Sequence, residues 1–154
     1  MVNVQEFFDK IKDIDDKNAG GCLFFCYLFF CWLRKNDYPT DNFEIIQMSS
    51  DFTEDRIQQN IEFINKQRDS AVSSAHFAWR YNGEEYDSEG ELNHVRWTYY
   101  TKATLPLFND ANAIVALCEN ALMNGRWNTW FDRNATIQII TERFGIDFSH
   151  LRLK

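Results

Sequence analysis

The spacing of apolar residues changes along this chain, and each spacing predicts one kind of element. Near the N-terminus, apolar residues three and four positions apart predict a helix from about Val4 to Asp15. Residues 17–21 should end this helix, because two adjacent glycines are costly inside one. The segment from Cys22 to about Lys35 is apolar on every face, which predicts a central helix enclosed by other elements. The N-terminal stripe consists of Val4, Phe7, Phe8, Ile11 and Ile14.

The middle of the chain carries strand and turn signals. A strand is expected from Phe43 to Met48, after a turn that contains Pro39, and another from about Val95 to Thr101. Between these strands, Thr53 is expected to cap a helix that runs to about Arg68. Asn82-Gly83 predicts a tight hairpin, because a type I′ turn needs positive φ at both central positions.

Helical patterns return near the C-terminus. Asn109 or Asp110 is expected to cap a helix that ends near Gly125, and a further helix is expected from Thr136 to Phe144. The chain has no repeat, low-complexity tract or linker, so residues 1–154 are expected to form a single globular domain. The predicted fold is α+β, with N-terminal helices, a buried central helix packed on a small antiparallel sheet, and C-terminal helices.

The hairpin brings a histidine and a carboxylate together. Counting outward from its turn places Trp79 opposite Tyr86, with the aromatic side chains on the core face. His76 and Asp87 become diagonal neighbours on the other face, where Asp87 can hold the imidazole in one tautomer. Glu89 lies opposite His76 in this count and is an alternative orienting carboxylate. The simpler interpretation is that these are ordinary polar residues on a solvated sheet face.

The four cysteines differ in their predicted settings. Three of them fall on the helix that begins at Cys22, which favours free thiols in a reducing compartment. Cys26, Cys31 and Cys118 lie in apolar helical patterns and are expected to pack as small hydrophobic residues. Cys22 occupies a first helical turn, where backbone N–H groups and the helix dipole favour a thiolate. The preceding glycines would let a substrate carbonyl approach the Cys22 backbone N–H as an oxyanion donor.

A zinc site is an alternative use of these residues. Cys22 and Cys26 lie one helical turn apart, and His76 or His94 would have to complete the ligand set. Structural zinc sites usually take closer cysteine pairs in tight turns, whereas the neighbours here are Leu and Phe. We therefore expect no metal and no cofactor.

Composition limits the partners. With a net charge of −7 and no basic cluster, the chain is not expected to bind nucleic acid. Its most apolar run, residues 22–33, is shorter than the roughly 20 residues that span a bilayer, and no signal peptide is recognised. We expect a soluble, cytoplasmic protein that does not engage membranes and whose substrate or partner is a protein or peptide. The sequence does not indicate an oligomeric state.

The order of these motifs resembles the papain-like cysteine enzymes, and most of all their transglutaminase-like branch. The motifs are Gly20-Gly21-Cys22 opening an apolar helix, the segment RKNDYPTDNFEII, and then His76-Phe77-Ala78-Trp79 followed by Tyr86-Asp87. The resemblance covers roughly residues 18–92. It implies that Cys22 is the nucleophile, His76 the general base and then acid, and Asp87 the residue that orients His76.

The resemblance implies thiol-dependent acyl transfer. With water as the acceptor the protein would be a cysteine peptidase or amidase, and with an amine it would be a transglutaminase-like transferase. The alternative is a catalytically inactive papain-like scaffold that acts as a protein-binding or inhibitory module. Small, acidic, aromatic-rich domains of this kind resemble phage-encoded proteins that interact with host proteins.

Overall fold

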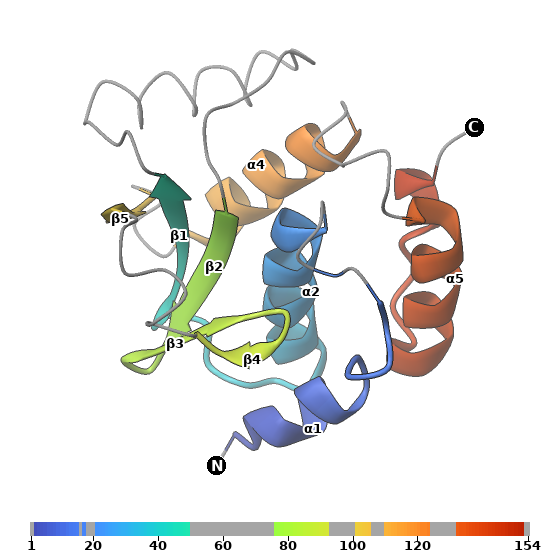
Figure 1. The fold of residues 1–154 in the computed structure, drawn as a ribbon, viewed down its shortest axis with the longest axis horizontal. Helices are drawn as coiled ribbons and strands as arrows, with labels where there is room; N and C mark the ends of the chain where they lie inside the picture. Colours follow the sequence, from blue (N-terminus) through green and yellow to red (C-terminus); the bar gives the residue numbers. More distant parts are fainter. Residues whose placement is uncertain are drawn as a thin grey trace.

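The computed structural model describes residues 2–15, 17, 21–49, 76–92, 101–105, 110–123 and 132–152. In these residues the fold is mixed α+β, and α2 lies at its centre with the sheet on one side and α5 on the other (Figure 1). The helices are α1 (Val4–Asp9), α2 (Cys22–Lys35), α4 (Ala111–Met123), α5 (Arg133–Phe144) and the short 3-10 helix η1 (Ser149–Leu151). The strands are β1 (Phe43–Ser49), β2 (His76–Tyr81), β3 (Glu84–Asp87), β4 (Gly90–Glu91) and β5 (Thr101–Thr104). The helix predicted from Thr53 and most of the strand predicted from Val95 lie outside the described residues.

The sheet has the strand order β4-β3-β2-β1-β5, and each neighbouring pair is antiparallel. The predicted hairpin turn is confirmed, since Asn82 and Gly83 both have positive φ, at 50° and 85°. Trp79 pairs with Tyr86, as the count from the turn predicts. β1 pairs along the whole of β2, so the end of β1 lies beside His76.

The helix boundaries differ from prediction at both ends of the chain. The N-terminal helix ends at Asp9, and the backbone N–H groups of Ile11 and Ile14 donate to carbonyls three residues earlier. Both isoleucines are nevertheless buried, so the apolar stripe was correct and the helix length was wrong. The last helix begins at Arg133 because the Asp132 side chain accepts a hydrogen bond from the Ala135 N–H and caps it.

Helix α2 is enclosed on all sides, as its sequence predicts. Its Phe29 ring lies 5.0 Å from the ring centroid of Phe7, 5.1 Å from that of Trp79 and 5.5 Å from that of Tyr81. These contacts fix α2 against both α1 and β2. Cys22, the first residue of α2, is thereby held at the end of the helix that faces the start of β2. No helix among the described residues combines the length and apolar character needed to cross a membrane.

The simpler interpretation, in which the second face of the hairpin is solvated, is wrong at one end of β2. Arg80, near the turn, is partly exposed and pairs with Glu44 and Glu85. His76 and Asp87 at the other end are only 2% and 4% exposed. A second, small apolar cluster is made of Ile46, Met48, Ala78 and Leu92, and its Met48 pairs with His76 across β1 and β2. The histidine and the aspartate therefore interact in a largely water-free setting.

Candidate active site

Three side chains from three elements form a continuous hydrogen-bonded line. The Cys22 sulfur, at the first position of α2, lies 3.2 Å from Nδ1 of His76 at the start of β2. The other ring nitrogen, Nε2, lies 3.0 Å from Oδ2 of Asp87 at the end of β3. The sequence places these residues 54 and 11 positions apart, and the fold brings all three into contact.

Asp87, and not Glu89, contacts the imidazole. The chain turns immediately after Asp87, so the extended pairing that would place Glu89 opposite His76 does not form. The backbone N–H of Glu89 instead donates to Oδ1 of Asp87 at 2.9 Å. The Glu89 side chain points to Lys17, with 3.8 Å between the charged atoms. Each carboxylate oxygen of Asp87 thus has its own partner. The hydrogen bond to Oδ1 holds the carboxylate in place, so that Oδ2 faces His76.

The order of atoms determines what the histidine can do. A carboxylate oxygen only accepts hydrogen bonds, so Nε2 of His76 must carry the hydrogen that it shares with Asp87. In the neutral ring, Nδ1 then presents a lone pair to the Cys22 thiol. Serine-protease triads use the two ring nitrogens the other way round, with Nε2 toward the nucleophile. The chemistry is equivalent, because one nitrogen is anchored and the other is free to move a proton.

The surroundings of His76 favour its charged form. Burial is the largest influence and by itself lowers the pKa of His76. Two effects outweigh burial, namely the hydrogen bonds to Asp87 and Cys22 and the negative charge of both partners. Together they raise the pKa of His76 from 6.5 to about 9. At neutral pH the site therefore favours an imidazolium ring.

This raised pKa predicts a pH dependence of stability. Because the folded pKa lies above the unfolded one, the protonated ring stabilises the fold fully below about pH 6.5, and this contribution is lost as the pH rises through about 9. We expect an NMR titration of the His76 ring to give a midpoint near 9, and Asp87→Asn to lower it. A midpoint below that of a free histidine would contradict the assigned partners.

The remaining cysteines have no comparable environment. Cys26 and Cys118 are fully buried, and burial raises the pKa of both thiols. Burial also raises the pKa of Cys31, to about 12. All four thiols are free, and among the described residues Cys22 is the one that contacts a histidine. The described residues also contain no group of three or more His, Cys, Asp or Glu side chains that would hold a metal ion, and His94 lies outside them.

Gln47 is a feature of this region that sequence analysis missed. It lies in β1, pairs with Phe77, and is fully buried. Within the described part of the chain, neither polar atom of its amide has a hydrogen-bond partner. A polar residue at a strand position in step with the buried Phe43 and Ile45 was a visible signal, but only the fold shows that the amide is enclosed. Buried amides without partners are rare and costly, so Gln47 lowers the stability of the sheet beside the triad.

Gln47→Leu is therefore expected to stabilise the protein. Removing the amide while keeping the side-chain volume should raise the free energy of unfolding by about 1–3 kcal/mol. Urea unfolding measures this change, with the same exchange at the exposed Gln138 as the control. The control should change stability by less than about 0.5 kcal/mol. Destabilisation by Gln47→Leu would mean that the amide forms a favourable interaction in solution.

Comparison with known proteins finds no protein-family model that matches the chain, and no curated protein or solved structure that is similar to it.

Proposed function

We propose that this protein is a thiol-dependent acyl-transfer enzyme built on a papain-like scaffold, with Cys22 as nucleophile, His76 as general base and acid, and Asp87 as the orienting carboxylate. One observation carries the proposal: the imidazole of His76 contacts the Cys22 sulfur through Nδ1, at 3.2 Å, and a carboxylate oxygen of Asp87 through Nε2, at 3.0 Å. Many acyl-transfer enzymes use this arrangement of nucleophile, base and orienting group. The transglutaminase-like order of motifs in the sequence supports the same assignment.

The first half-reaction forms a thioester. The Cys22 proton resides on Nδ1 of His76 in the thiolate–imidazolium pair, and the thiolate sulfur attacks the carbonyl carbon of an amide. The backbone N–H of Cys22, in the first turn of α2, is the expected donor to the oxyanion, supported by the positive end of the helix dipole. When the C–N bond breaks, His76 gives its proton to the leaving amine, and the acyl group remains on sulfur.

The second half-reaction decides between hydrolysis and transfer. His76 removes a proton from the acceptor, which attacks the thioester, and the sulfur leaves as a thiolate. Water as the acceptor releases a carboxylic acid, and a primary amine gives a new amide. Because the leaving amine needs the imidazolium proton, activity should fall as the pH rises through about 9.

The experiment is a turnover assay with a defined peptide mixture, with and without methylamine, read by mass spectrometry. Hydrolysed peptides indicate a peptidase or amidase, and methylamide products indicate a transferase. Cys22→Ala should abolish either product. Cys31→Ala, which removes a thiol from the same helix, should leave the rate unchanged within a factor of about two. Product formation that persists in Cys22→Ala would overturn the proposal.

A further inference from the structure

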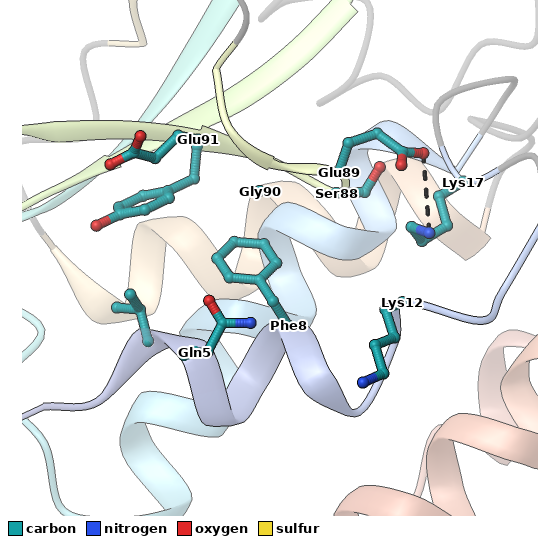
Figure 2. Close-up of a pocket in the computed structure, with 10 residues that line it drawn as sticks. Gln5, Phe8, Lys12, Lys17, Ser88, Glu89, Gly90 and Glu91 are labelled. Carbon is teal, nitrogen blue, oxygen red and sulfur yellow. Dashed lines mark ion pairs between the residues drawn. The ribbon is translucent and has the colours of Figure 1, made fainter.

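A pocket separate from the sulfur and the imidazole lies between the N-terminal segment and the β3–β4 turn. Its volume is about 450 Å³, and neither Cys22 nor His76 lines it. Figure 2 shows Ser88, Glu89, Gly90 and Glu91 along one side and Gln5 and Phe8 along the other, with Lys17 at one end. The turn that follows Asp87 thus forms one wall of the pocket, but Cys22, His76 and Asp87 themselves do not line it.

The pocket has an aromatic wall. The Phe8 and Tyr86 rings lie 5.7 Å apart between centroids, tilted by 36°. Both residues are buried against the main core, so the rings are held rigidly. A flat or branched apolar group is the kind of ligand that packs on such a wall.

Lys17 supplies a charged group at one end of the pocket. It is only 3% exposed, although lysine is almost never buried without partners. Its ammonium donates one hydrogen bond, at 2.8 Å, to the backbone carbonyl of Ile14. Glu89 lies 3.8 Å away, beyond hydrogen-bond distance, and its side chain is 56% exposed. An ammonium has three donors, so among the described residues Lys17 retains donor capacity toward the pocket that it lines.

We propose that this pocket binds a small carboxylate that carries an aromatic or branched apolar group, as the C-terminal residue of a peptide or a free amino acid does. The carboxylate accepts a charge-assisted hydrogen bond from Lys17 and is attracted by the exposed Lys12, another residue of the lining. The apolar group packs on Phe8 and Tyr86. Binding in this pocket does not depend on Cys22, so its test is independent of the test of the acyl-transfer proposal.

The test is an NMR titration of the full chain with N-acetyl-L-phenylalanine. Shifts are expected at the amides of Phe8 and Gly90, and Cys22→Ala should not weaken them. N-acetyl-L-phenylalanine amide, which lacks the charge, should bind at least about tenfold more weakly. Lys17→Met should cause a similar loss, because it keeps the length of the buried side chain without the ammonium. Lys102→Met, the same exchange on β5 outside the lining, is the matched control.

Gln5→Trp tests the pocket without changing a buried residue, since Gln5 is exposed and lies in the lining. The indole ring, which is larger than the glutamine side chain, should fill the pocket and abolish binding. Free L-phenylalanine distinguishes the sources: tighter binding than the acetylated form indicates an amino acid, and weaker binding indicates a peptide terminus. The proposal is overturned if the acetylated probe does not bind at millimolar concentration. Equal binding of its amide, or unchanged affinity in folded Lys17→Met or Gln5→Trp, would overturn it as well.

Discussion

Replacing His76 by alanine is expected to slow the alkylation of Cys22 at pH 6 by about a hundredfold or more. An ordinary cysteine, with a pKa of about 8.5, is less than about 1% thiolate at that pH. In the native site the imidazolium lies 3.2 Å from the sulfur and stabilises the thiolate as a charge pair. Without the ring, the thiolate loses this charge pair, and the dipole of α2 gives it weaker support.

Peptide mapping of the native protein after iodoacetamide treatment measures this rate for each cysteine. Cys26 and Cys118 serve as internal references, because both are fully buried. His150→Ala is the matched control, since His150 pairs with Glu119 and does not contact a thiol in the described structure. If Cys22 reacts no faster than the buried cysteines, or equally fast in both variants, the activated thiol does not exist. The protein would then be treated as a binding module on the same scaffold.

Phe29→Ala is expected to lower the free energy of unfolding by about 3–5 kcal/mol. The ring is fully buried and contacts six aromatic rings of described residues, and truncation removes those contacts and leaves a cavity. A loss of this size is a large fraction of the roughly 5–15 kcal/mol that stabilises a typical domain. Because Phe29 joins α2 to β2, the same change should loosen the contact between Cys22 and His76.

Urea unfolding measures the loss, and Phe29→Leu is the control because it keeps most of the buried volume. The leucine variant should lose less than half as much stability as the alanine variant. Similar losses in both would mean that ring stacking matters more than volume. A loss below about 1 kcal/mol in Phe29→Ala would contradict the packing described for α2.

The features predicted correctly were those that local sequence controls. The bounds of α2 follow from a glycine break and a run that is apolar on every face. The register of the hairpin follows from Asn82-Gly83, because the turn type fixes which residues pair. The helix at Val4 was predicted too long, because burial of Ile11 and Ile14 continued the apolar stripe through turns that are not helical. Apolar periodicity reports which residues are buried, and only indirectly reports backbone conformation.

The site was predicted in part. The hairpin count places His76 and Asp87 on one face, whereas Cys22 was joined to them through the resemblance alone, since that contact depends on how α2 packs on β2. The choice between Asp87 and Glu89 depended on where β3 ends. The burial of Lys17 and Gln47 was not predicted, because it comes from residues distant in the chain.

The formation of a thioester tests the central claim most directly. The protein is mixed at pH 7 with p-nitrophenyl acetate, and its intact mass and the released nitrophenolate are followed together. The proposed site predicts rapid addition of one acetyl group per chain on Cys22, removable by hydroxylamine, abolished by Cys22→Ala and slowed by His76→Ala. Slow acetylation spread over lysines, or the same rapid uptake in Cys22→Ala, would show that Cys22 is not an activated nucleophile.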